Sequence, residues 1–352
     1  MRRPGVQICL LLVLCAASAL AAKRPSPIKP SPKPSPWAGD FSRGDDPVVR
    51  LAAITALGEQ QGAVVVVDPE TGRLLTVVNQ KLAFSAGFIP CSTIKLLAGL
   101  AALEEGLVGP ETKVWFDGYW FMTMKEGLAI SNNVYFEHLG RRLGFDRLKR
   151  HAHRFGFGEK AGWQIPGEQV GAFPAQEHSY GIARMTTFGD GISATPLQLA
   201  AFVSSLANGG KLYYLQYPRD ATAIEHFQPK LKRETEAGRW ASALELGMAE
   251  AVRRGTGRRA RTAGQKIWGK TGTCSQESLR RRTPVGWFAS YNEAEGRRLA
   301  VVVMLKGRSD AGGPRAAEVA GNVYRALGEH QYFSSGPEKL QLVAVADSCL
   351  SD

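Results

Sequence analysis

A serine and a lysine stand three positions apart in Ser92-Thr93-Ile94-Lys95, where the sequence pattern becomes helical. Residues at this spacing on a helix project from the same face, so the two side chains would be neighbours. Ser92 could then act as a nucleophile, with Lys95 as its base if burial or nearby cations lower the lysine pKa. Backbone N–H groups at a helix start would favour the developing negative charge. The same spacing also arises by chance, so this motif alone leaves a purely structural role open.

Ser131-Asn132-Asn133 follows 39 residues further along the chain. A hydroxyl beside a lysine amine can relay a proton to a leaving group, and a carboxamide can hydrogen-bond an amide of a substrate. These properties make Ser131 a candidate catalytic residue and Asn133 a candidate substrate-binding residue. Ser and Asn are also preferred at helix N-caps, and one segment can serve both purposes.

Lys270-Thr271-Gly272-Thr273 stands on an apolar strand pattern. Lysine and threonine side chains could clamp a substrate carboxylate, and a glycine lets backbone come close. The N–H that follows could donate to an oxyanion. We therefore consider Lys270 catalytic and the next three residues substrate-binding. A strand end followed by a turn is the alternative.

The elements that must position these motifs follow from the hydrophobic periodicity. Residues 62–68 and 73–78 predict a β-hairpin across a glycine-containing turn. Residues 93–105 are helical and nearly all apolar, which predicts a helix buried on most faces. Strands near both ends with helices between them predict an α+β fold with one mixed sheet and an inserted helical region. Further helices are expected over 132–143, 145–155, 196–208 and 314–328, and further strands over 268–275, 285–291 and 298–306.

The N-terminal residues predict export. Arg2 and Arg3 precede a short apolar run, and Ala19-Leu20-Ala21 supplies the small residues of a cleavage site. The run is shorter than the roughly 20 residues of a spanning helix, so we expect cleavage and no stable membrane span afterwards. The expected location is periplasmic or extracellular. The expected organisation is a signal peptide (1–22), a Pro/Ser/Lys-rich linker (23–45), a catalytic domain (46–333) and a tail (334–352).

The formal net charge of the 352-residue chain is +12, and removal of two arginines with the signal peptide lowers it to +10. Nucleic acid is not an expected partner of an exported chain, whereas anionic cell-envelope polymers are candidates. Solvated basic faces are the alternative. His151 and His153 resemble a metal pair, but alternate residues on a helix point apart and no third ligand is suitably spaced. We therefore expect basic surface there and no metal.

The order of the three motifs resembles that of the penicillin-binding protein transpeptidase domain, within the serine D,D-transpeptidase and β-lactamase superfamily. The resemblance covers roughly residues 60–330. It is carried further by residues 129–135, 155–158, 189–200, 207–210 and 255–257.

This resemblance implies an antiparallel five-stranded sheet flanked by helices, with a mostly helical lobe and the site between them. It implies Ser92 as the nucleophile, Lys95 as its base and Ser131 as the proton relay, with Asn133 holding a substrate amide. Lys270, Thr271 and Thr273 would bind the carboxylate that peptide stems and penicillins share. The N–H groups of Ser92 and Thr273 would form the oxyanion hole, and no cofactor is implied.

Three cysteines would remain after signal cleavage, namely Cys91, Cys274 and Cys349, and export permits disulfides. Cys91 and Cys274 stand at the relative positions that are bridged in certain class A carbapenem-hydrolysing β-lactamases. This resemblance implies a Cys91–Cys274 disulfide that holds both halves of the oxyanion hole in register. Two buried free thiols are the alternative, and the sequence assigns no role to Cys349.

The step that removes the acyl group separates members of the superfamily. Class A β-lactamases use a glutamate in a Glu-x-x-Leu-Asn pattern, which is absent between Asn133 and Lys270; Glu168 lacks the following Leu-Asn. Class D enzymes have an apolar residue where this chain has Asn133. A β-lactam adduct should then be long-lived, which favours a D,D-transpeptidase or carboxypeptidase acting on D-Ala-D-Ala stems of peptidoglycan. A divergent β-lactamase and, less favoured, a non-catalytic β-lactam sensor are the alternatives.

Overall fold

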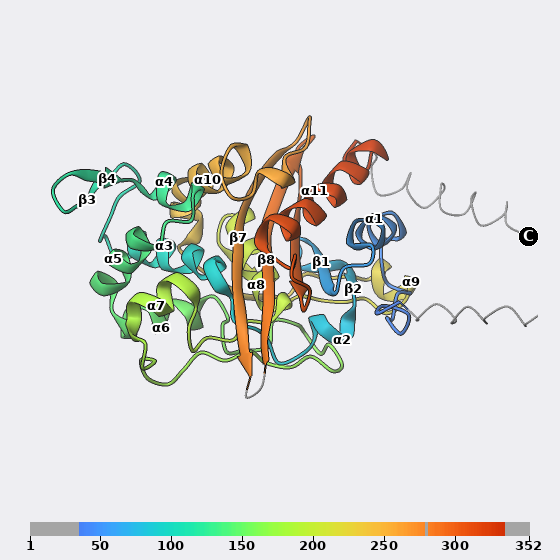
Figure 1. The fold of residues 1–352 in the computed structure, drawn as a ribbon. Coiled ribbons are helices and arrows are strands. Elements are labelled where there is room, and N and C mark those ends of the chain that lie inside the picture. The colour runs from blue at the N-terminus through green and yellow to red at the C-terminus, as the bar shows by residue number, and fades with distance from the viewer. Residues whose placement is uncertain (1–34, 279–280, 335–352) are drawn as a thin grey trace, which may run out of the picture. The chain divides into compact units, whose positions relative to one another are not determined.

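A central sheet joins segments from the two ends of the described chain (Figure 1). The computed structural model describes residues 35–278 and 281–334. The five strands lie in the order β2-β1-β9-β8-β7, and every neighbouring pair is antiparallel. The expected five-stranded antiparallel sheet of an α+β fold is therefore confirmed. The strands are β1 (Gly62–Asp68), β2 (Arg73–Val78), β7 (Lys266–Ser278), β8 (Arg281–Ala294) and β9 (Arg297–Lys306).

The valine-rich strand β1 shows that the sheet is covered on both faces. Successive side chains of a strand point to opposite faces. Val64 and Val66 pack into one apolar cluster with residues of α1 (Pro47–Leu57) and α11 (Gly313–Glu329), whereas Val65 packs into a second cluster on the other face. A short continuous apolar run is the pattern expected of such a fully buried strand.

Two helices that are apolar on nearly every side fill the second cluster: α3 (Ile94–Glu104) and α8 (Pro196–Ala207). All residues of α8 are buried. Its start is fixed by a capping box, in which Thr195 and Gln198 each accept a hydrogen bond from the other's backbone N–H. The Thr195 and Gln198 side chains therefore fix where the buried helix α8 begins, and α8 packs against the sheet.

The remaining elements lie between β2 and β7, in the helical region that the sequence predicts. β3 and β4 form a hairpin, and β5 pairs with β6. The elements are α2 (Gln80–Ala83), the 3-10 turn η1 (Cys91–Thr93), β3 (Val114–Phe116), β4 (Trp120–Met122), α4 (Met124–Ala129), α5 (Asn133–Leu143), α6 (Phe145–Arg154), α7 (Gly181–Phe188), β5 (Lys211–Tyr213), α9 (Ala221–Glu225), β6 (Leu231–Glu234), α10 (Ala237–Arg253) and the 3-10 turn η2 (Arg258–Ala260).

Strands β7 and β8 continue beyond their predicted ends at Ser275 and Val285. Their pairing runs on to Ser278 and Arg281. The added residues are mostly polar, so backbone hydrogen bonds extend the ladder where the apolar pattern on which the prediction relied has stopped. The hairpin of β3 and β4 was also not predicted.

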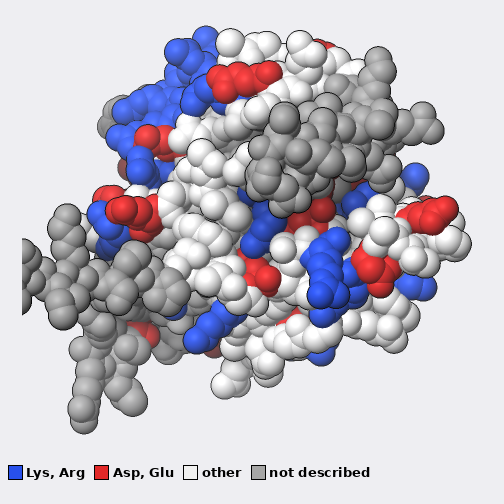
Figure 2. All heavy atoms as spheres, turned by 90° about the vertical axis from the view of Figure 1, so that its right-hand side faces the viewer, with Lys and Arg blue, Asp and Glu red and all other residues white. Residues whose placement is uncertain are grey.

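Basic side chains are interspersed with acidic ones on the face shown in Figure 2, including at its upper left, where Lys and Arg gather. Several arginines that stand close together in the sequence, at 253–254 and 258–261, have acidic partners. Arg253 and Arg254 both pair with Glu250, and Arg259 pairs with Glu318. Solvated, partly neutralised basic faces therefore account for these arginines.

In the part of the chain that the structure describes, no helix combines the length and the apolar character that a membrane crossing needs. The predicted signal peptide (1–22), the first part of the predicted linker (23–34), residues 335–352 of the tail and Cys349 lie outside the described residues.

Candidate active site

Ser92 lies in the 3-10 turn η1, directly before the buried helix α3. Cys91 has a left-handed backbone with φ of 50°, an unfavourable conformation for a residue with a Cβ, and one that clusters at functional sites. The half-buried Ser92 donates from Oγ to the backbone carbonyl of Thr187, 3.5 Å away, and this hydroxyl forms no other hydrogen bond among the described residues. A sharp turn therefore presents the serine hydroxyl at the start of a helix.

Lys95 is buried one turn later, and its amine contacts the second motif. Nζ donates to the carbonyl of Ser131 (2.8 Å), to Ser131 Oγ (3.2 Å) and to Asn133 Oδ1 (2.6 Å). Burial lowers the pKa of Lys95 to about 7, and the negative charge of Glu137 opposes this only in part. A substantial fraction of Lys95 is therefore neutral near pH 7, as a general base must be.

Ser131 lies between two lysines. Its Oγ also accepts a hydrogen bond of 2.8 Å from Lys270 Nζ. Lys270 is buried, and its pKa is well below the usual value because of burial and of the nearby Lys95 charge. The hydroxyl thus bridges two amines, which is the arrangement that a proton relay needs.

The capping role expected as the alternative for this segment falls to Asn132. Its side chain accepts from Tyr135 N at 2.9 Å and caps α5. Ser131 has a left-handed backbone with φ of 57°. The cap and the turn therefore leave Ser131 and Asn133 free to contact Lys95.

Strand β7 places the third motif beside the first. Gly272 faces the nucleophile turn, where an added Cβ would lie 3.1 Å from Pro90 O and 3.2 Å from Cys91 Cβ. Thr271 is buried and donates to Thr256 Oγ1 (2.6 Å), while the exposed Thr273 accepts from Gly313 N (2.8 Å). Lys270 and Gly272 thus face the helical region. The hydroxyls of Thr271 and Thr273 are instead hydrogen-bonded to Thr256 and to the Gly313 N–H.

The structure joins Lys95, Ser131, Asn133 and Lys270 in one hydrogen-bonded group and sets Gly272 against the turn of Ser92. Sequence reasoning missed three contacts. Thr187 contributes only a carbonyl oxygen and gives no side-chain signal. Thr256 lies within the quoted Gly255-Thr256-Gly257 segment, but nothing assigned its hydroxyl to Thr271, and Gly313 acts through its backbone N–H.

The sulfur atoms of Cys91 and Cys274 lie within bonding distance, and their Cα atoms are 5.6 Å apart. This Cα separation suits a disulfide. Cys91 directly precedes Ser92, and Cys274 directly follows Thr273. The two cysteines thus lie side by side where the turn of Ser92 meets β7.

Gly272→Ala should impair both the site and the fold. The new Cβ forces β7 and the turn of Ser92 apart by a few tenths of an ångström, since its contacts would be 3.1–3.2 Å. We expect acylation of Ser92 by a penicillin to slow by about 10- to 100-fold. The free energy of unfolding should fall by about 1–3 kcal/mol. Gly109→Ala, with one ordinary contact at 3.5 Å, is the control. Equal acylation rates for both variants and the wild type would refute the tight contact.

Among the described residues, no group of three or more His, Cys, Asp or Glu side chains is arranged to hold a metal. The prediction of basic surface is wrong for His151, which is buried. Its two ring nitrogens lie 3.2 Å from Glu104 Oε2 and 2.9 Å from Glu105 Oε1, at the end of α3. The helix α6 presents this histidine to a neighbouring helix, while His153 is exposed.

A five-stranded antiparallel sheet beside a helical region, with a serine, two lysines and a second serine between them, defines a protein of the β-lactamase-like fold. The sequence model described as "Penicillin binding protein transpeptidase domain" matches residues 62–325. The chain therefore belongs to the penicillin-binding protein transpeptidase domain family, as the sequence predicts.

Relatives and solved structures agree with this family. The chain is 30% identical over 280 residues to stage V sporulation protein D of Bacillus subtilis, covering 71% of this chain and 43% of that protein. It is 25% identical over 369 residues to peptidoglycan D,D-transpeptidase MrdA of Acinetobacter baumannii, covering 81% and 54%. The chain thus spans about half the length of these relatives. The transpeptidase domain of Burkholderia pseudomallei penicillin-binding protein 3 shares its fold, with a TM-score of 0.66, 19% identity, and coverage of 80% of this chain and 91% of that one.

Proposed function

We propose that this protein is a penicillin-binding serine acyltransferase that acts on D-Ala-D-Ala stems of peptidoglycan, as a D,D-transpeptidase or carboxypeptidase. The observation that carries the proposal is the position of the Ser131 hydroxyl between the buried amines of Lys95 and Lys270. Lys95 itself follows Ser92 by one helical turn. The relatives named as peptidoglycan D,D-transpeptidases support the same activity.

Acylation proceeds in two moves. Ser92 Oγ forms a bond to the carbonyl carbon of the penultimate D-Ala, and its proton passes to the neutral amine of Lys95. The tetrahedral intermediate then collapses as the C–N bond to the terminal D-Ala breaks, and the departing amine receives a proton through Ser131. The N–H groups of Ser92 and Thr273 stabilise the oxyanion. An acceptor amine, or water, afterwards takes the acyl group from Ser92.

Substrate binding falls to the residues around this centre. Asn133 holds an amide of the substrate, and Lys270 with Thr271 and Thr273 binds the terminal carboxylate. The hydroxyls of Thr271 and Thr273 exchange their present partners, Thr256 and the Gly313 N–H, for that carboxylate. A disulfide between Cys91 and Cys274 fits the proximity of the two sulfur atoms and a site outside the cytoplasm. Export through a cleaved signal peptide brings the enzyme to peptidoglycan.

Glu168, the nearest sequence candidate for a deacylating base, has another role. It is buried, and it accepts hydrogen bonds from the N–H groups of Ala161 (2.9 Å) and Gly162 (3.0 Å). Burial raises its pKa, and these two N–H groups oppose the rise. Because its oxygens hold a loop, Glu168 is unsuited to activating a water at Ser92. This disfavours the β-lactamase alternative.

A time course of intact-protein mass after addition of a penicillin tests the function. We expect a mass increase of one intact penicillin that persists for many turnovers of a typical β-lactamase, since no carboxylate among the described residues is hydrogen-bonded to Ser92 Oγ. Ser92→Ala should stay unmodified. Rapid return of the wild type to its free mass with opened drug would instead establish a β-lactamase.

A D-Ala-D-Ala pentapeptide, with and without an amine acceptor, separates the remaining outcomes. Release of D-Ala alone indicates a carboxypeptidase, and a new amide with the acceptor indicates a transpeptidase. A stable penicillin adduct with neither reaction of the peptide would contradict the enzyme proposal in favour of a sensor.

A further inference from the structure

Two adjoining hollows lie around Tyr217, apart from the residues of the catalytic group. One has a volume of about 560 Å³ and is formed by residues 163–166, 216–219, 223, 226–228 and 230. The other, of about 460 Å³, adds residues 39, 41, 80, 81, 84, 85, 167 and 169. They share the wall made by Ile165, Pro166, Tyr217 and Arg219, so together they form one continuous binding surface. No Asp or Glu lines either hollow.

The larger hollow combines flat aromatic rings with amides. Trp163, Tyr217 and Phe227 line it, together with the side chains of three glutamines, Gln164, Gln216 and Gln228. Trp163 is 41% exposed, although such a large ring is usually mostly buried. Exposed rings present apolar faces on which the C–H faces of a sugar ring can stack, and amides can bond hydroxyl and acetamido groups.

Three cations line the hollows, and none of them has an acidic partner among the described residues: Lys81, Arg219 and Lys230. The guanidinium carbon of Arg219 lies 3.8 Å from the centre of the Phe41 ring, and Lys230 Nζ lies 4.7 Å from that of Trp163. Both contacts are cation–π interactions, which hold a cation in place without neutralising it. The surface is therefore set up for a ligand that carries negative charge beside sugar-like rings.

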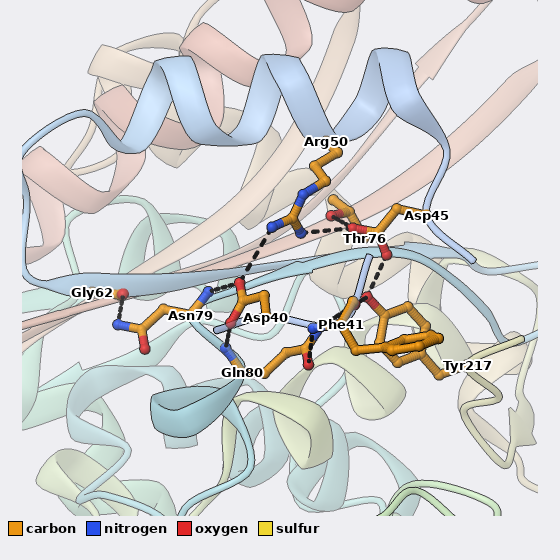
Figure 3. Close-up of polar contacts among 9 residues, drawn as sticks. All are labelled: Asp40, Phe41, Asp45, Arg50, Gly62, Thr76, Asn79, Gln80 and Tyr217. Atoms are coloured by element: carbon orange, nitrogen blue, oxygen red, sulfur yellow. Dashed lines mark hydrogen bonds and ion pairs between the residues drawn. The ribbon is translucent and has the colours of Figure 1, made fainter. Parts of the chain in front are cut away.

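Hydrogen bonds and ion pairs on the inner side of the shared wall fix the position of Tyr217, and Figure 3 shows these contacts. The Tyr217 hydroxyl accepts from Gln80 Nε2 at 3.0 Å and donates to the buried Asp45. Arg50 in turn pairs with Asp45 at 2.7 Å and with Asp40 at 3.6 Å. Gln80 also exchanges two hydrogen bonds with the backbone of Phe41, on whose ring Arg219 rests. Such a supporting network preorganises a binding surface.

We propose that these hollows bind an acidic glycan strand, built of N-acetylated amino sugars that carry carboxylates. Trp163 and Phe227 stack on the sugar rings, the glutamines bond the acetamido groups, and Arg219 and Lys230 pair with the carboxylates. Such a surface holds a stretch of the polymer's backbone that carries no stems, because a sugar that bears a stem has its carboxyl in an amide bond. The choice of this particular glycan rests on the proposed function. The argument that the ligand has sugar-like rings and negative charge rests only on the residues that line the hollows.

The test uses the full chain and fluorescent strands of alternating N-acetylglucosamine and N-acetylmuramic acid freed of stem peptides. We expect Trp163→Ala, and separately the double variant Arg219→Ala/Lys230→Ala, to weaken binding about tenfold or more. Trp163→Phe, which keeps a ring, should lose much less. Only the double variant should leave binding of neutral chitohexaose unchanged, because that ligand has rings but no carboxylate.

Matched controls are Trp115→Ala, which removes a tryptophan 56% exposed on β3, and Arg261→Ala, which removes an exposed arginine outside the hollows. Binding of Trp163→Ala equal to that of Trp115→Ala would overturn the proposal, as would displacement of the strand by polyphosphate as readily as by unlabelled strand. If Trp163→Ala lowers the melting temperature, the test rests on strand binding by the double variant Arg219→Ala/Lys230→Ala, because both of these side chains are exposed. Penicillin acylation of Ser92 should be unchanged in all these variants, so failure of glycan binding and failure of the enzyme proposal are distinguishable.

Discussion

Lys95→Ala is expected to slow acylation of Ser92 by a penicillin about 100- to 10,000-fold at neutral pH, the usual contribution of a positioned general base. The buried Lys95 follows Ser92 by one helical turn, and its amine donates hydrogen bonds to Ser131 and Asn133. Its removal takes away the proton acceptor and also one of the two donors to the relay hydroxyl. The second-order rate constant of acylation, from the rise of adduct mass with time, measures the effect.

The pH profile separates a base from a structural lysine. Burial lowers the pKa of Lys95 to about 7, so the amine is protonated and unable to accept a proton below that pH, and neutral above it. Wild-type acylation should therefore rise with pH and reach half its plateau near pH 7. The rise should be lost in Lys95→Ala.

Lys95→Arg is the matched control, because arginine keeps the charge but is not deprotonated in proteins. It should acylate as slowly as Lys95→Ala. A wild-type rate that does not change with pH around 7, or an Arg variant with near wild-type rates, would contradict the role of Lys95.

The sequence allowed the grouping of Lys95, Ser131, Asn133 and Lys270 to be predicted because these side chains stand in local motifs. Lys95 follows Ser92 by one turn, and strand β7 must present Lys270 to one face. The surroundings of the nucleophile could not be predicted in the same way. Thr187 is 95 residues from Ser92 and contributes a carbonyl oxygen, which every residue has. Only the packing of α7 beside η1 makes that oxygen available.

The limits elsewhere have the same physical origin. Helix periodicity correctly separates His151 from His153, but whether a polar face meets water or Glu104 and Glu105 depends on which helix packs there. In β7 and β8, backbone pairing continues beyond the end of the hydrophobic pattern, because a backbone hydrogen bond needs no apolar side chain. Patterns thus predict which elements form, and tertiary contacts decide what their polar residues do.

The double variant Cys91→Ala/Cys274→Ala is expected to be less stable than the wild type by about 2–5 kcal/mol in free energy of unfolding. A bridge between these positions closes a loop of 183 residues, and a long loop restricts the unfolded chain strongly. It also ties the left-handed backbone of Cys91 to the strand that carries Thr273. We therefore expect slower penicillin acylation as well, since the two N–H groups of the oxyanion hole lose their common anchor.

A reducing agent provides the matched comparison. It should lower the denaturation midpoint and the acylation rate of the wild type toward those of the double variant, and leave the double variant unchanged. Alkylation in denaturant without reduction, followed by peptide mass mapping, should leave Cys91 and Cys274 unmodified. Modification of both residues in the unreduced protein would show free thiols. The stability of the turn would then come from the packing of Gly272 against Pro90 and Cys91, and Gly272→Ala would be the more damaging change.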